Sequence, residues 1–152
     1  MVAIEGSVLI ACPVEEVFDV VADERNEPRY NPRMTGVEKL TPGPVGTGTR
    51  WAATIDSRGR PLDIEVEVTD YDRPRRLAST TTMAVAEIRG ALTFDPDPAG
   101  TVMRWRWDLR PKGVIRLLGP VLARVGRRQE AAIWAGLKEY LESPPAPRGR
   151  AG

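Results

Sequence analysis

The side chains able to transfer a proton are few in this chain, and their types limit its chemistry. The sequence contains no histidine and a single cysteine, Cys12. Zinc sites of the Cys/His type, Ser-His-Asp catalysis and Cys-His catalysis are therefore excluded. The remaining candidates are Tyr30, Tyr71, Tyr140, a buried carboxylate or an arginine. Their spacing identifies no matched acid and base, so we assign no catalytic residue, and we expect no metal and no cofactor.

A strand rich in tryptophan is the clearest local signal. Apolar and polar residues alternate strictly over residues 101–109, which predicts a half-buried strand. Its inner face would carry Thr101, Met103, Trp105, Trp107 and Leu109. Indoles on such a face, with Trp51 from another strand, either fill a core or form a pocket wall that stacks on a flat apolar ligand.

A long helix is predicted after this strand, over residues 113–142. The apolar period changes there to 3.6, with a break at Gly119-Pro120. After the break, the predicted inner face holds Leu122, Val125, Ala132, Ile133, Gly136 and Tyr140. Gln129 falls near the middle of this face, where an unpaired amide would cost about 1–3 kcal/mol. It would bond either a ligand or water in a cavity, or backbone at the sheet edge.

Hydroxyl groups could add polar contacts to such a cavity. Tyr30 would present its hydroxyl at the mouth. If Leu77 points inward, strand alternation brings Ser79 and Thr81 inward too; otherwise the strand is bulged and both are exposed. The candidate ligand-binding residues are therefore Tyr30, Trp51, Ser79, Thr81, Met103, Trp105, Trp107, Leu122, Val125 and Gln129.

The order of elements predicts the fold class. A strand over residues 2–11 precedes a helix opened by Pro13, and residues 23–32 form a second short helix or turn. Further strands are predicted at residues 37–40, 49–55, 62–69, 75–82 and 87–94. Runs of strands followed by a helix indicate α+β with an antiparallel sheet. Residues 1–142 form a single domain, and the Pro-rich residues 143–152 are expected to be a disordered tail.

Several local strings, in this order, resemble one superfamily. They are residues 12–23, 30–32, 45–51, 72–77 and 100–105. The superfamily (SRPBCC) includes START lipid-transfer domains, birch-pollen-allergen-like plant proteins and bacterial polyketide cyclase/dehydrase proteins. The resemblance implies a helix-grip fold: a curved antiparallel sheet of six to seven strands around a long C-terminal helix, with an apolar cavity between them. It implies a pocket but no particular reaction.

Two functional hypotheses follow from this resemblance. The first is a binder of a small apolar ligand, aromatic or polyketide- and lipid-like, held between sheet and helix. The second is a polyketide cyclase/dehydrase-type enzyme that promotes aldol closure or loss of water in the same cavity. A partner-binding scaffold remains a third class, because a fold does not fix a function.

Charge and hydropathy limit the partners. The net charge is only +1, which implies no strong general attraction to nucleic acid or to an anionic membrane. A basic run is interpreted as the solvated face of the final helix; it consists of Arg110, Lys112, Arg116, Arg124, Arg127 and Arg128. The N-terminal residues do not resemble a secretory signal, and no apolar run approaches the length of a membrane span. We therefore expect a soluble cytoplasmic protein.

The helical phase also places one tryptophan away from the sheet. Trp134 falls beside Arg127 and Lys138 on the predicted outer face. Because tryptophan is enriched where proteins meet, we expect it to be covered. The candidates are the N-terminal segment, the Pro-rich tail and a second subunit, and a homodimer is the preferred one.

Overall fold

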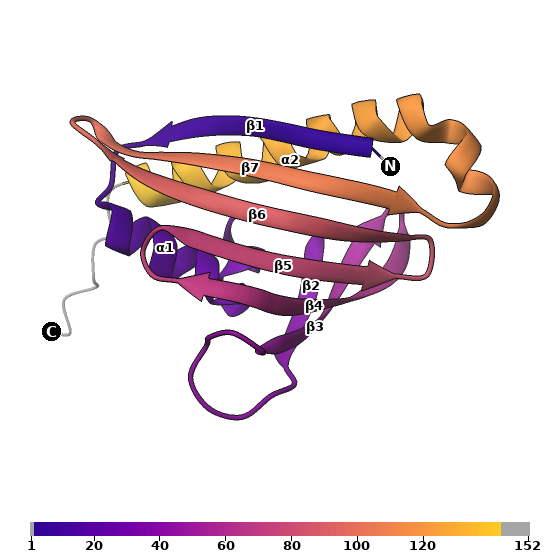
Figure 1. Cartoon of the computed structure of the whole chain (residues 1–152), viewed down its shortest axis with the longest axis horizontal. Helices are drawn as coiled ribbons and strands as arrows, with labels where there is room; N and C mark the ends of the chain where they lie inside the picture. Colours follow the sequence, from indigo (N-terminus) through magenta and orange to yellow (C-terminus); the bar gives the residue numbers. More distant parts are fainter. Residues whose placement is uncertain (1, 144–152) are drawn as a thin grey trace, which may run out of the picture.

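A computed structural model describes residues 2–143 of the chain (Figure 1). The strands are β1 (Val2–Ile10), β2 (Met34–Lys39), β3 (Arg50–Ser57), β4 (Arg60–Asp72), β5 (Arg76–Met83), β6 (Ala86–Asp97) and β7 (Gly100–Pro111). The helices are α1 (Val14–Ala22), η1 (Glu24–Arg29), η2 (Gly113–Leu118) and α2 (Gly119–Glu142), of which η1 and η2 are 3-10 helices. None of these helices is both long enough and apolar enough to cross a membrane. Apart from Ser143, the predicted tail lies outside the described residues.

The seven strands form one antiparallel sheet in the order β1-β7-β6-β5-β4-β3-β2. Figure 1 shows the sheet curving, with α1 and α2 on its concave side. The predicted α+β helix-grip fold is therefore confirmed. A curved sheet with one helix across its opening leaves an interior that side chains must fill or leave empty.

The alternation predicted for β7 is confirmed. Thr101, Met103 and Trp105 are buried, whereas Arg104 and Arg106 are exposed on the outer face. Arg104 pairs there with Asp95 on β6 at 2.7 Å. An exposed pair of this kind contributes at most about 1 kcal/mol, so the sheet is held mainly by its buried face.

One end of the concave side is filled by α1. Val14, Val17, Phe18 and Val21 are buried at the helical spacing expected from the sequence. The Phe18 ring lies edge-on to Phe94, with 5.2 Å between ring centroids. This packing closes one end of the interior and leaves space toward the middle of the sheet.

The inner face of α2 differs from the predicted one. Trp134 is only 5% exposed, and its ring lies 6.1 Å from that of Trp105 and 6.3 Å from that of Tyr30, centroid to centroid. The prediction that Trp134 points away from the sheet is therefore wrong. The predicted phase counted Ala132 and Tyr140 as buried, yet both are exposed.

The central stripe of the inner face runs through Ala123, Gly126, Glu130, Trp134, Leu137 and Leu141, and it is flanked by Leu122, Val125, Ile133 and Gly136 of the predicted face. The positions of the central stripe are three or four residues apart, as one helical face requires. Residues of this chain cover Trp134, so the argument for a homodimer through an exposed indole no longer holds.

Polar bonds hold the C-terminal end of α2 to the end of β1. The Lys138 ammonium donates to the carbonyl oxygen of Leu9 at 2.8 Å. The Glu142 carboxylate accepts from the backbone N–H of Ala11 at 3.2 Å and pairs with Lys138 at 2.6 Å. These contacts fix the end of the helix farthest from η2.

Two glycines of α2 allow the helix to pack closely against its neighbours: Gly136 lies against the backbone of Tyr30, and Gly126 lies against the side chain of Ile4. A methyl group at Gly136 would meet the backbone oxygen of Tyr30, whereas one at Gly126 would meet only the flexible end of the Ile4 side chain.

Alanine gains about 1 kcal/mol of helix propensity over glycine. We expect Gly136→Ala to lower the free energy of unfolding by about 1–3 kcal/mol through overpacking. Gly126→Ala should stay within about 1 kcal/mol of the parent. Urea unfolding measures both, and equal effects would contradict the close approach at Tyr30.

Candidate functional site

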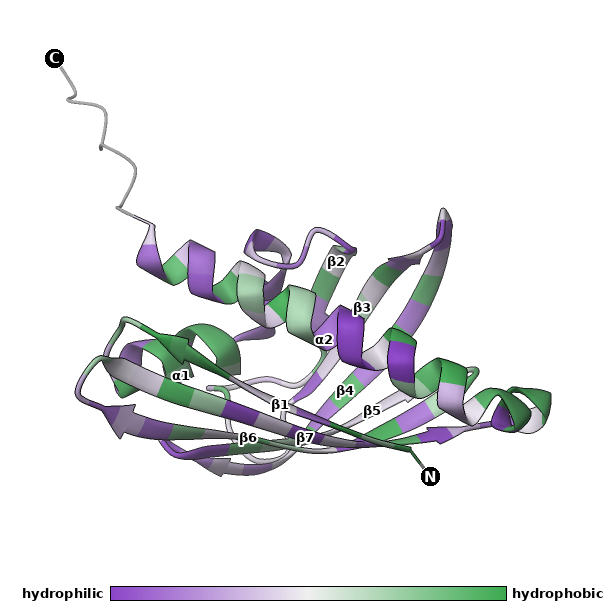
Figure 2. Cartoon of the chain, turned by 90° about the horizontal axis from the view of Figure 1, so that it is seen from above, coloured by the Kyte–Doolittle hydropathy of each residue, from purple (hydrophilic) through white to green (hydrophobic). Residues whose placement is uncertain are grey.

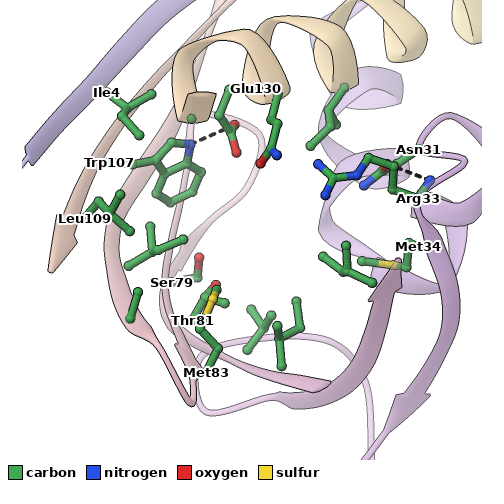
Figure 3. A pocket seen from close by; sticks show the side chains of 18 of the residues that line it. Ile4, Asn31, Arg33, Met34, Ser79, Thr81, Met83, Trp107, Leu109 and Glu130 are labelled. Atoms are coloured by element: carbon green, nitrogen blue, oxygen red, sulfur yellow. Dashed lines mark hydrogen bonds between the residues drawn. The ribbon is translucent and has the colours of Figure 1, made fainter. Parts of the chain in front are cut away.

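A cavity of about 380 Å³ lies between the concave face of the sheet and α2. Figure 3 shows side chains of the sheet and of α2 directed into it. Its wall is mainly apolar and includes Ile4, Ile64, Met83, Leu92, Leu109 and Ile133. The volume falls within the usual range of small-molecule sites, about 300–1,000 Å³.

Six of the ten candidate ligand-binding residues line this cavity: Ser79, Thr81, Trp107, Leu122, Val125 and Gln129. Because Leu77 is buried, the alternation of β5 brings Ser79 and Thr81 to the inner face, where they add hydroxyls to an apolar wall (Figure 3). Gln129 lines the cavity from α2 and also stays exposed.

The other four candidates, Tyr30, Trp51, Met103 and Trp105, lie in the packed core outside this lining. Tyr30 and Trp105 pack against Trp134, and Met103 belongs to the same cluster. Trp51 is fully buried in a separate cluster with Met34 and Ile64. Its indole N–H finds no hydrogen-bond partner among residues 2–143. These four residues therefore pack against residues that line the cavity, without lining it themselves.

Polar side chains gather at one end of the cavity. Glu24 and Glu27 come from η1, and Asn31 and Arg33 come from the segment that leads into β2. The Asn31 amide donates to the Glu27 carboxyl at 3.3 Å. The Asn31 side-chain oxygen accepts from the Arg33 backbone N–H at 3.2 Å (Figure 3). The Arg33 guanidinium donates to the carbonyl oxygen of Asp56. These bonds hold the polar end in place.

Glu130 adds a third carboxyl from α2. It accepts from the indole nitrogen of Trp107 at 3.0 Å (Figure 3). It also accepts from the indole nitrogen of Trp134 at 2.7 Å. Burial raises the pKa of Glu130, while the two indole bonds act in the opposite direction by favouring the charged carboxylate. The side chain therefore joins the sheet, the helix and the cavity.

The pKa values of the two carboxyls from η1 are raised above their ordinary range. Burial raises the pKa of Glu27 to about 7, and the charge of Glu130 adds to the rise, while the Asn31 bond opposes it. Burial, together with the charges of Glu27 and Asp23, raises the pKa of Glu24 well above its ordinary value. A carboxyl with a pKa near 7 can both give and accept a proton at neutral pH. In the part of the chain that the structure describes, no group of three or more acidic or cysteine side chains could hold a metal ion.

The sequence analysis allowed for a buried carboxylate but did not name Glu24, Glu27 or Glu130. Glu130 carried a usable signal, because it is the only acidic residue between Asp108 and Glu139 and lies one turn before Trp134. The two carboxyls from η1 carried none, since they belong to a polar segment that is typical of a turn.

Comparisons with known proteins agree with this architecture. The family model described as polyketide cyclase / dehydrase and lipid transport matches residues 1–142. The fold is similar to that of a START superfamily protein from Mycobacterium smegmatis, with a TM-score of 0.81 and 15% identity over 92% of this chain and 97% of that one. It is also similar to the ZhuI aromatase/cyclase from Streptomyces sp. R1128, with a TM-score of 0.79 and 19% identity over 92% and 93% of the two chains. The search of curated proteins gave no match.

The raised pKa of Glu27 predicts a pH dependence of stability. A carboxyl whose pKa rises on folding stabilises the fold below its ordinary pKa of 4.5, and this contribution is lost as the pH rises through about 7. In the parent, the unfolding free energy should therefore fall between about pH 4.5 and pH 7. In Glu27→Gln this fall should be smaller by on the order of 1–3 kcal/mol. Chemical denaturation at a series of pH values measures it, with the exposed Glu38→Gln as control. Parallel curves for Glu27→Gln and the parent would contradict the shift.

Proposed function

Because the chain belongs to the polyketide cyclase / dehydrase and lipid transport family, we propose that it binds a small, mostly apolar ligand in the cavity between the sheet and α2. The observation that carries this proposal is the cavity itself, about 380 Å³ of space with an apolar wall and a few polar groups at one end. Such a site binds apolar surface through the hydrophobic effect and orients the ligand through the polar groups.

The distribution of polar groups supports a ligand with an oxygen-bearing end. A protonated Glu27 could donate to a carbonyl or hydroxyl oxygen at the η1 end of the cavity. Ser79 and Thr81 would meet a second oxygen farther along the β5 wall. Trp107 offers a flat surface on the β7 wall of the cavity, which suits an aromatic or polyketide-like ligand. The name of the ZhuI aromatase/cyclase supports the same class of ligand.

An enzyme of the cyclase/dehydrase type is the second candidate, and Glu27 is the observation that favours it. Aldol closure needs a base to remove a proton from carbon and an acid to return one to oxygen. A carboxyl with a pKa of about 7 can do both in turn. The cavity would supply the rest by holding the chain in a folded conformation.

Filling the cavity should block ligand binding. Thr81→Phe would place a ring in the cavity, whereas Thr82→Phe would place the same ring on the exposed outer face of β5. We expect Thr81→Phe to weaken the binding of an apolar fluorescent probe by about tenfold or more, because the ring takes the space of the probe. Thr82→Phe should bind as the parent does. Fluorescence titration measures both, and equal binding by the two variants would overturn the proposed site.

Turnover would distinguish an enzyme from a carrier. We expect a short poly-β-keto thioester to cyclise faster with the protein than in buffer if the second candidate holds. Glu27→Gln should then slow this reaction by about a hundredfold or more, while leaving probe binding intact. Product analysis by liquid chromatography measures the rate. If the thioester binds but does not cyclise faster, the enzyme candidate is wrong and the carrier function is the one that remains.

A further inference from the structure

The segment that joins β7 to α2 combines exposed aliphatic side chains with an excess of positive charge. Val114 is 83% exposed, Leu117 85%, Leu118 52% and Val121 57%. Val114, Leu117 and Val121 are three or four residues apart along η2 and the start of α2, and Leu118 is adjacent to Leu117. Figure 2 shows hydrophobic residues gathered at this end of α2. Val85 is 39% exposed, and its carbonyl oxygen accepts from the N–H of Lys112 at 2.9 Å, so the backbone of Val85 lies two residues from the start of this group. We call these five residues the apolar patch.

The patch lies within the basic run identified in the sequence. No acidic residue occurs between Asp108 and Glu130. All six cations of the run are exposed, and within residues 2–143 none of them forms an ion pair. The basic run is solvated as expected, but the sequence analysis did not foresee that the apolar residues between its members would also face solvent. Exposed aliphatic groups usually mark a surface that something covers.

We propose that the apolar patch and its flanking cations dock the protein on an anionic lipid bilayer. Aliphatic side chains enter the boundary between headgroups and acyl chains, and nearby arginine and lysine side chains are attracted to anionic headgroups. The chain offers both features along one segment, which contains no acidic residue between Asp108 and Glu130. This inference rests on the patch and goes beyond the proposed function.

Charge and composition favour a bilayer over the other occupants of such a surface. A symmetric dimer through the patch would bring two copies of the basic run together, and like charges oppose such contact. Protein interfaces are enriched in aromatic residues, whereas the patch contains only valine and leucine. An aliphatic surface flanked by cations is instead complementary to an anionic membrane surface.

The position of the patch connects it with the cavity. On the other side of the same segment, Ile115 and Leu122 line the cavity, and Val85 belongs to both the patch and the cavity lining. A bilayer bound to the patch would therefore lie against one end of the cavity. Apolar molecules could pass there between membrane and protein without crossing much water.

Vesicle binding of the full chain tests the proposal. We expect cosedimentation with vesicles of phosphatidylcholine and phosphatidylglycerol, weaker binding at high salt, and weak or no binding to phosphatidylcholine alone. Leu117→Asp should weaken partitioning to the anionic vesicles by about tenfold or more. Arg124→Gln should weaken it by about fivefold, the effect of one cation near the surface. Leu40→Asp, at an exposed leucine outside the patch, is the matched control and should bind as the parent does.

Two results would overturn the proposal. One is equal binding of the parent and Leu117→Asp to anionic vesicles. The other is no vesicle binding by the parent, together with a dimer in light scattering that Leu117→Asp abolishes, which would make a second copy the occupant. Because Leu117 is almost fully exposed, its substitution leaves the core intact, and probe binding in the cavity reports the fold of each variant.

Discussion

The carboxyl of Glu130 joins two indoles that come from different layers of the fold. Trp107 belongs to β7 and Trp134 to α2, and both donate to the same oxygen. The bond from Trp107 fixes the rotation of α2 about its own axis, because an indole on β7 can reach Glu130 only when this side chain faces the sheet. Removing the carboxyl would leave two partly buried N–H groups without their acceptor. The lining that α2 gives to the cavity depends on this rotation.

The cavity exists because large side chains separate α2 from the sheet without filling the space beside them. Tyr30, Trp105 and Trp134 pack together at one end, and α1 with Phe18 fills the adjoining interior. The middle of the sheet offers smaller side chains, such as Ser79 and Thr81, which do not reach the helix. The chain belongs to a family whose fold admits carriers and enzymes alike, so the polar groups at the end of this space carry the functional argument.

The sequence predicted the sheet well because alternation in a strand has only two phases. In β7, the positions of Met103 and Trp105 relative to Arg104 determine which face is buried, and the structure agrees. The helix has many possible phases, and its inner stripe includes Glu130 and Gly126, which hydropathy does not mark as buried. Gly126 and Gly136 face inward because backbone and side chains approach closely there. The apolar pattern of α2 therefore predicted the wrong side of the helix for Trp134.

The site was harder to predict than the fold, since its polar end is assembled from distant parts of the chain. Glu27 and Glu130 are 103 positions apart in the sequence, and only the fold brings both into the lining of one cavity. Their shifted pKa values arise from burial, which no local pattern encodes. The polar segment at residues 23–32 has the composition of an ordinary turn, and its role follows from where that turn lies.

Because the chain has no histidine, a carboxyl of the cavity can be followed by infrared spectroscopy near neutral pH. Histidine is the side chain that ordinarily exchanges protons near neutrality, and this chain has none. The carboxyl of Glu27 takes that place, inside the cavity instead of on the surface. The carbonyl stretching band of a protonated carboxyl is well separated in the infrared from that of a carboxylate. Protonated carboxyls of the cavity lining would thus serve as a vibrational reporter, whose intensity would change when a guest molecule alters their surroundings.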